Sequence, residues 1–164
     1  MTKVNFVILA AGKGTRMRSS LPKVLHKLSG RSMLGHVVAA VESLGEAKKI
    51  IVTGHGAEQV EQQFKSPTTI FTQQKEQLGT GHAVHMAVPE LCSDAVVIVL
   101  YGDVPLIRPA TIQKILAVVT ESTMGLLTIN LDQPTGYGRI VRNTKGDITE
   151  IIEQKDASVE QLKI

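Results

Sequence analysis

Glycine and basic side chains gather directly after the first apolar segment of the chain. An apolar run over 4–11 leads into Gly12-Lys13-Gly14-Thr15-Arg16-Met17-Arg18, and Leu21-Pro22-Lys23 follows. Glycine lets the backbone approach a phosphate group closely, and Arg and Lys neutralise the phosphate charge. The loop matches neither the dinucleotide-binding fingerprint, because Met17 replaces the third glycine, nor the P-loop. We therefore predict phosphate binding, with a tight strand-to-helix turn as the alternative interpretation.

The basic residues are concentrated at the start of the chain. The first 41 residues hold seven Lys or Arg and no acidic residue, whereas the remainder holds 11 basic and 15 acidic side chains. A cluster of one sign beside a glycine loop attracts a polyanion. Aromatic residues make up only 3% of the chain and no long basic run occurs, so we do not expect nucleic acid as the partner.

Two further polar segments follow predicted strands. The segment Tyr101-Gly102-Asp103-Val104-Pro105 places a carboxylate just after an apolar strand, where it can bind Mg²⁺ or cap a turn. The segment 73–82 combines glutamines, which carry the donor and acceptor needed to read a base edge, with glycines. A solvated loop with Thr80 as the helix N-cap explains the same residues. The histidines, His82 and His85 among them, show no metal-ligand pattern, and we predict surface or packing roles for them.

Short β-branched runs alternate with segments of helical period. The predicted strands are 4–10, 49–53, 69–72, 95–101 and 124–130. The predicted helices are 33–44, 56–64, 80–88 and 109–119. Segments 137–142 and 147–153 are predicted to pair as a β-hairpin.

This alternation predicts an α/β fold, namely a Rossmann-like, doubly wound and mostly parallel sheet followed by a C-terminal β-hairpin. The near-continuous apolar run over 95–100 indicates a central strand covered on both faces. Ligands of such sheets bind beyond the carboxyl ends of the strands. One pocket can therefore hold the segments 11–18, 73–81 and 101–105.

Length and composition suit one domain in a reducing compartment. No apolar run approaches the roughly 18 residues that a membrane span requires, and the single cysteine, Cys92, cannot form an internal disulfide. We expect a cytoplasmic protein that does not partner a membrane.

The motif 9–17 followed by 21–23 resembles the signature of sugar-1-phosphate nucleotidyltransferases. Four further motifs narrow the match, namely 77–83, 100–106, 134–140 and 153–157. In this order they are similar to the N-terminal domain of the bacterial bifunctional N-acetylglucosamine-1-phosphate uridyltransferases / glucosamine-1-phosphate acetyltransferases. The resemblance spans essentially all 164 residues and implies the nucleotide-diphospho-sugar transferase type of fold.

The resemblance implies a reaction in which a phosphate oxygen of N-acetylglucosamine 1-phosphate attacks the α-phosphorus of UTP. The products are UDP-N-acetylglucosamine, a precursor for cell wall and lipopolysaccharide, and pyrophosphate, with Mg²⁺ as the cofactor. By the same resemblance, Arg16 and Lys23 are catalytic and Asp103 holds the metal. The implied substrate-binding residues are Leu9, Ala10, Ala11, Gly12, Lys23, Gln74, Gly79, Thr80, Tyr101, Gly102, Asp103, Gly138 and Glu153.

The resemblance also implies that residues 1–164 are the N-terminal part of a longer chain. In the family, the transferase domain continues with a second metal ligand and further sugar contacts, and a β-helix acetyltransferase follows. We expect the full-length protein to be a homotrimer, and this part to be monomeric and without acetyl transfer. Two alternatives stay open: a nucleotide-binding module without turnover, and a related nucleotidyltransferase for another base or sugar.

Overall fold

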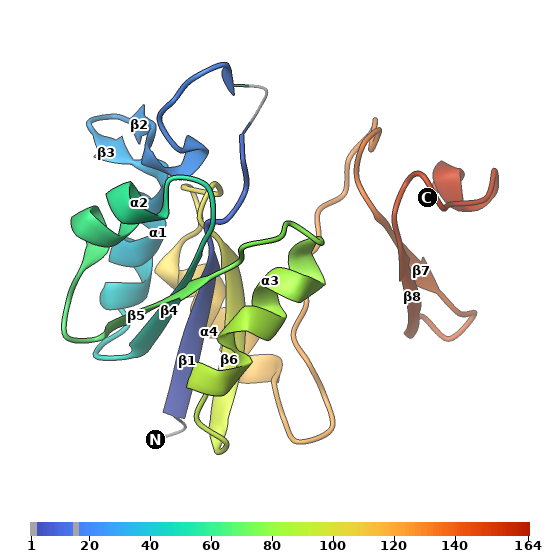
Figure 1. The fold of residues 1–164 in the computed structure, drawn as a ribbon. Coiled ribbons are helices and arrows are strands. Elements are labelled where there is room, and N and C mark those ends of the chain that lie inside the picture. Colours follow the sequence, from blue (N-terminus) through green and yellow to red (C-terminus); the bar gives the residue numbers. More distant parts are fainter. Residues whose placement is uncertain (1–2, 15–16) are drawn as a thin grey trace. The chain divides into compact units, whose positions relative to one another are not determined.

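The structure is a computed structural model that describes residues 3–14 and 17–164 (Figure 1). The chain divides into two compact units, of which the first ends at Gly125 and the second covers Leu126–Ile164. None of the helices in the described residues has the length and apolar content needed to cross a bilayer.

A four-stranded parallel sheet forms the centre of the first unit, with the strand order β5-β4-β1-β6. Its strands are β1 (Lys3–Leu9), β4 (Lys48–Thr53), β5 (Thr69–Gln73) and β6 (Ala95–Tyr101). The chain runs from β1 outward to β5 and then returns to the other side of β1. The strand order therefore reverses between β1 and β6, and ligands of such sheets bind at that point.

Three α-helices connect these strands and a fourth follows β6, and each agrees with its predicted range to within two residues at either end. They are α1 (Met33–Glu42), α2 (Ala57–Phe64), α3 (Thr80–Ala87) and α4 (Pro109–Val118). Helix α1 begins at Ser32, whose Oγ accepts a hydrogen bond from the Gly35 amide at 3.2 Å. Helix α4 begins with Pro109, whose fixed φ suits the first helical position.

The helices cover both faces of the sheet, as the doubly wound prediction requires (Figure 1). On one face, α1, α2 and α4 bury Leu34, Val37, Val41, Val60 and Ile112 against Phe6, Ile8, Ile51, Ile98 and Leu100. On the other face, α3 buries Ala83 and Ala87 against Val7, Ile50 and Val52. Small alanines let α3 lie close to the sheet, so its first turn is held rigidly near the carboxyl ends of the strands.

Strand β6 lies at the edge of this sheet, which corrects the prediction of a central strand covered on both faces. Ile98 and Leu100 face the core, whereas Val97 and Val99 on the opposite face are 38% and 39% exposed. Helix α3 packs on β1 and β4, so within the described residues no helix covers the second face of β6. An apolar run indicates that a strand is hydrophobic, but it does not indicate whether one or both faces of the strand are covered by other elements.

A small hairpin that was not predicted precedes α1. It consists of β2 (Lys27–Leu28) and β3 (Arg31–Ser32), and the 3₁₀ helix η2 (Lys23–Leu25) leads into it. Its two loop residues, Ser29 and Gly30, have φ values of 49° and 85°. Positive φ at both positions matches the two-residue turn that suits the twist of hairpin strands.

The second unit contains the predicted C-terminal hairpin. Strands β7 (Arg139–Arg142) and β8 (Ile148–Ile152) pair antiparallel, with Arg139 opposite Ile152. The Asn143 amide donates to the Asp147 carbonyl at 3.0 Å and closes the turn. Two further 3₁₀ helices are η3 (Val88–Glu90) in the first unit and η4 (Gln161–Lys163) in the second.

The strand predicted over 124–130 is wrong. The structure gives this segment no regular secondary structure, and Leu127 and Ile129 are 58% and 70% exposed. A strand needs a neighbour to accept its backbone hydrogen bonds, and no strand of the described residues pairs with this segment. Its alternating apolar residues predict β structure only when such a partner is present.

Candidate active site

A cavity of about 320 Å³ opens at the carboxyl ends of the strands, where the strand order reverses. Its lining comes from the end of β1, η2, the loop after β5, the start of α3 and the loop after β6. These residues are Leu9, Ala10, Ala11, Gly12, Lys23, Val24, Gln74, Gln77, Gly79, Thr80, Ala83, Tyr101 and Asp103. The three chain segments that the topology predicted to meet do meet around this cavity.

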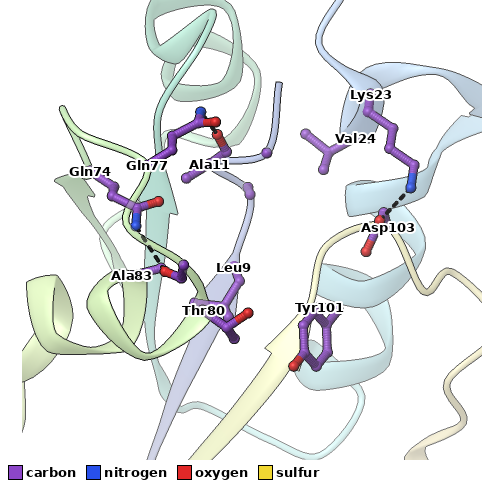
Figure 2. Close-up of a pocket in the computed structure, with 13 residues that line it drawn as sticks. Leu9, Ala11, Lys23, Val24, Gln74, Gln77, Thr80, Ala83, Tyr101 and Asp103 are labelled. Carbon is purple, nitrogen blue, oxygen red and sulfur yellow. Dashed lines mark hydrogen bonds and ion pairs between the residues drawn. The ribbon is translucent and has the colours of Figure 1, made fainter. Parts of the chain in front are cut away.

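Figure 2 shows how the labelled side chains divide around the cavity. Gln74, Gln77 and Thr80 lie on one side, and the end of β1 lies between them and the opposite wall. Lys23 and Asp103 occupy that opposite wall. Uncharged hydrogen-bonding groups therefore face charged groups across the same space. This division suits a ligand that has a polar ring at one end and charge at the other.

The backbone at the end of β1 is held by three neighbours. Gln77 Nε2 donates to the Ala11 carbonyl at 2.6 Å, and the Gly102 amide donates to the Leu9 carbonyl at 2.9 Å. Gly54, directly after β4, lies so close that a Cβ there would be 2.6 Å from the Ala11 oxygen. The backbone from Leu9 to Ala11 is therefore held in place by the protein itself.

Lys23 and Asp103 form an ion pair at the cavity wall. The distance from Lys23 Nζ to Asp103 Oδ2 is 2.6 Å, and the two side chains are 34% and 31% exposed. Asp103 follows β6, and η2 begins with Lys23, so the pair joins segments 80 residues apart. Lys23 thus already has an anionic partner, although no acidic residue lies near it in the sequence.

The loop between β5 and α3 is organised around Gln74, which is only 4% exposed. Gln74 Nε2 lies 3.0 Å from the Gly79 carbonyl and 3.1 Å from His82 Nδ1. Gly79 occupies the N-cap position of α3 with a φ of 102°, a conformation that favours glycine. Thr80 is the first helical residue, so the alternative with Thr80 as the N-cap is wrong.

The remaining predicted residues of the first unit differ in placement. Tyr101 lines the cavity and is 50% exposed. Gly102 is buried and supports Leu9 from behind rather than lining the cavity. Arg16, predicted to be catalytic, lies outside the described residues.

Gly138 and Glu153 belong to the second unit, which is described by itself. Gly138 directly precedes Arg139 and Glu153 directly follows Ile152, and those two residues are paired in the hairpin register. A Cβ at Gly138 would be 3.2 Å from the Ile152 carbonyl oxygen. The hairpin therefore brings these two positions together, and their contact with a sugar stays a prediction.

Sequence reasoning missed several residues that shape the cavity. Gln77 lies inside a motif that was recognised, but no role was assigned to it. Gly54 directly follows β4, at the carboxyl ends of the strands where the cavity lies. Its position after a strand is the only feature of the sequence that could have pointed to it. Val24 and Ala83 also line the cavity, and their sequence patterns are those of ordinary core residues.

Within residues 3–14 and 17–164, no group of three His, Cys, Asp or Glu side chains is placed to hold a metal ion. Asp103 nevertheless offers a carboxylate at the cavity wall. Mg²⁺ is commonly bound by one or two carboxylates together with phosphate oxygens of the substrate. The site therefore fits a cation shared with a bound phosphate and does not fit a metal held by protein ligands alone.

The chain is similar to known nucleotidyltransferases in sequence and in fold. The profile of the MobA-like NTP transferase domain matches residues 6–145. Bifunctional protein GlmU of Cellvibrio japonicus is 54% identical over 158 residues, which are 96% of this chain and 35% of that protein. The chain thus spans about a third of the length of this curated relative.

Two solved structures show the same fold. A UDP-glucose pyrophosphorylase complexed with UDP-glucose superimposes with a TM-score of 0.75 at 18% identity, covering 94% of this chain and 69% of that chain. A Mycobacterium tuberculosis protein in complex with manganese gives a TM-score of 0.60 at 24% identity, covering 71% and 59% of the two chains. The family match over most of the chain confirms the resemblance drawn from the motifs. The chain belongs to the family of MobA-like NTP transferase domains.

Proposed function

We propose that this chain carries out the nucleotide-binding part of a uridylyl transfer from UTP to N-acetylglucosamine 1-phosphate. The products are UDP-N-acetylglucosamine and pyrophosphate. The observation that carries the proposal is the cavity beyond the ends of β1 and β6, where the strand order reverses. It combines the buried Gln74, the backbone of Leu9 to Gly12 and the Lys23–Asp103 ion pair. The similarity to Bifunctional protein GlmU supports the choice of nucleotide and sugar.

The nucleotide is proposed to lie across the cavity. Gln74 with Gly79 and Thr80 contacts the base, and the backbone from Leu9 to Gly12 lies against the nucleotide. Lys23 and Arg16 neutralise the phosphates and stabilise the charge that develops on departing pyrophosphate. The attacking phosphate is already anionic, so the reaction needs alignment and charge neutralisation more than a general base.

Asp103 is proposed to hold Mg²⁺ together with phosphate oxygens of the substrate. The bound cation would offset phosphate charge and orient the reacting groups. Support comes from the Asp103 carboxylate at the cavity wall, and from the manganese complex of a protein that shares this fold. Because Lys23 already contacts this carboxylate, the amine must move aside or share it when a cation binds.

The sugar is proposed to contact the open end of the second-unit hairpin. Gly138 leaves room there because it has no side chain, and Glu153 supplies a carboxylate that can accept hydrogen bonds from sugar hydroxyl groups. The register that places these positions next to each other supports this assignment.

The wider biological role is proposed from the similarity to Bifunctional protein GlmU. The enzyme is proposed to act in the cytoplasm as a UDP-N-acetylglucosamine diphosphorylase that supplies precursors for peptidoglycan and lipopolysaccharide. The whole protein is proposed to be a homotrimer.

The proposal is tested by measuring pyrophosphate release from UTP, N-acetylglucosamine 1-phosphate and Mg²⁺ by the native protein that carries this chain. Arg16→Ala and Lys23→Ala should each lower turnover about a hundredfold or more, as the loss of a charge-stabilising donor does. Arg31→Ala removes an exposed basic residue that does not line the cavity, and it should retain turnover. Full turnover in Arg16→Ala would refute the role of that residue, and UTP binding without pyrophosphate release would favour a binding module.

A further inference from the structure

The hydrogen bonds of Gln74 determine which end of its amide group faces the cavity. Its backbone amide donates to the Thr53 carbonyl at 2.8 Å, which fixes the start of the side chain beside β4. Its Nε2 atom lies 3.0 Å from the Gly79 carbonyl oxygen. A carbonyl oxygen only accepts hydrogen bonds, so the amide nitrogen, and not the amide oxygen, must face Gly79.

The second hydrogen of this amide is used by His82. Nε2 lies 3.1 Å from His82 Nδ1. Because the amide nitrogen is a donor, Nδ1 must accept, so the ring proton of neutral His82 is on Nε2. Both hydrogens of the Gln74 amide are then engaged within the protein. The amide oxygen is the group that remains for a ligand, and Figure 2 shows it on the cavity side of the Gln74 side chain.

We infer that His82 is a positioning residue that makes the site selective for uracil over cytosine. It holds Gln74 so that an acceptor, and not a donor, meets the Watson–Crick edge of the base. Uracil has a hydrogen on N3 and can donate to this oxygen, whereas N3 of cytosine is an acceptor and would face another acceptor. This inference rests on the proposed function, in which Gln74 contacts the base.

The fold explains why His82 can act in this way without touching the ligand. His82 is in the first turn of α3, is half-buried and does not line the cavity. Ala83, next to it, is buried against β1 and β4 and sets the position of the first turn. If His82 is removed, the Gly79 carbonyl alone favours this orientation. The rotated amide then costs less free energy than before, and a larger fraction of the molecules presents the amide nitrogen to the base.

The test is the ratio of the dissociation constants for CTP and UTP, measured by calorimetry on the unmodified chain and on variants of His82. The unmodified chain should prefer UTP. His82→Leu removes the acceptor and should lower the ratio about tenfold, the effect expected from losing one buried hydrogen bond. His82→Asn keeps an acceptor near the position of Nδ1 and should retain most of the preference. His85→Leu alters an exposed histidine of the same helix and should leave the ratio unchanged.

A role for His82 in packing alone would change stability and would not move this ratio. If His82→Leu does not fold, His82→Gln replaces it, because its longer side chain carries the amide beyond the Nδ1 position. A CTP-to-UTP ratio in His82→Leu, or in His82→Gln where it replaces that variant, equal to the ratio of the unmodified chain would overturn the inference and leave the proposed function standing. A failure of the unmodified chain to bind UTP would overturn both.

Discussion

Lys23 Nζ and Asp103 Oδ2 lie 2.6 Å apart at the wall of the cavity, and neither side chain is fully buried. In this pair, the Lys23 amine, which is proposed to bind phosphate, contacts the Asp103 carboxylate, which is proposed to bind a cation. In the ligand-free protein, Lys23 therefore competes with the cation for Asp103. A nucleotide that draws Lys23 to its phosphates releases the carboxylate, so nucleotide and cation should bind more tightly together than separately.

Lys23→Met is predicted to strengthen Mn²⁺ binding to the nucleotide-free chain. Removing a competing charge from a partly exposed pair is worth about 1 kcal/mol, which corresponds to roughly a fivefold change in affinity. The same variant should bind UTP more weakly because a phosphate partner is lost. Calorimetric titration with MnCl₂ measures the first effect without any assay of turnover.

Lys3→Met is the matched control for this variant. Lys3 forms a similar pair with Asp94 at 2.7 Å, but both side chains are largely exposed and neither lines the cavity. The hydrogen bond from Lys3 lowers the pKa of Asp94, so the exposed pair is intact at neutral pH. Mn²⁺ binding should be unchanged in Lys3→Met. Unchanged or weaker Mn²⁺ binding in Lys23→Met would show that Lys23 does not block the carboxylate.

Gly14→Ala is predicted to damage both the fold and the site. Gly14 has a φ of 59°, and a Cβ there would be 2.7 Å from Lys23 Cβ. The left-handed conformation alone costs a non-glycine residue about 1–2 kcal/mol, and the clash displaces Lys23. Chemical denaturation and UTP titration should both show a loss.

Gly12→Ala separates these two effects. Within the described residues, no heavy atom lies within 4 Å of the position of a Cβ at Gly12, and this residue lines the cavity. The unfolding free energy of Gly12→Ala should stay within about 0.5 kcal/mol of that of the unmodified chain. Its affinity for UTP should fall because a methyl group enters the cavity. Equal stability losses in the two variants would contradict the different geometries of Gly12 and Gly14.

Gly54→Ala is predicted to destabilise the protein by about 1–3 kcal/mol, the usual cost of overpacking. The added Cβ would be 2.6 Å from the Ala11 oxygen and 2.9 Å from the Ala11 Cα, and backbone cannot rotate away as a side chain can. Gly81→Ala is the control, because its Cβ meets no described atom within 4 Å and alanine favours the helix. Urea unfolding should show a lower midpoint for Gly54→Ala and an unchanged midpoint for Gly81→Ala. Similar midpoints would show that the Gly54 position does not constrain the Ala11 backbone.

Gln77→Ala is predicted to lower the free energy of unfolding by about 1 kcal/mol and to weaken UTP binding, because the β1 backbone that is proposed to lie against the nucleotide is no longer held. The variant loses the 2.6 Å hydrogen bond to the Ala11 carbonyl, and one such bond contributes about 1 kcal/mol. Gln73→Ala alters an exposed glutamine of the same region that does not line the cavity, and it should bind UTP normally. Calorimetry that finds the two variants equal would remove Gln77 from the site.

The parts of the fold that depend on local pattern were predictable from the sequence. Four parallel strands, four helices and the C-terminal hairpin follow from periodicity and turn residues, and the rule for switch points located the cavity. The Ser29-Gly30 dipeptide also carried a recognisable turn signal that was not used.

The parts that depend on partners were not predictable. The edge position of β6 and the coil over 124–130 depend on which strands lie alongside, and periodicity carries no such information. Counting the basic residues of the first 41 positions likewise does not show which of them have acidic partners elsewhere in the sequence. Lys23 pairs with Asp103, which is 80 residues away. Whether a histidine packs or positions another side chain, as with His82 and Gln74, is decided by atoms that only the folded chain brings together.

Calorimetric titration of the unmodified chain with UTP and, separately, with inorganic tripolyphosphate tests whether the cavity recognises a uridine nucleotide and not phosphate charge alone. We expect UTP to release or absorb measurable heat, to raise the melting temperature and to bind more tightly than tripolyphosphate, because Gln74 and the β1 backbone add to the contacts with phosphate. Absence of heat and of thermal protection with UTP, or equal binding of tripolyphosphate, would contradict this expectation.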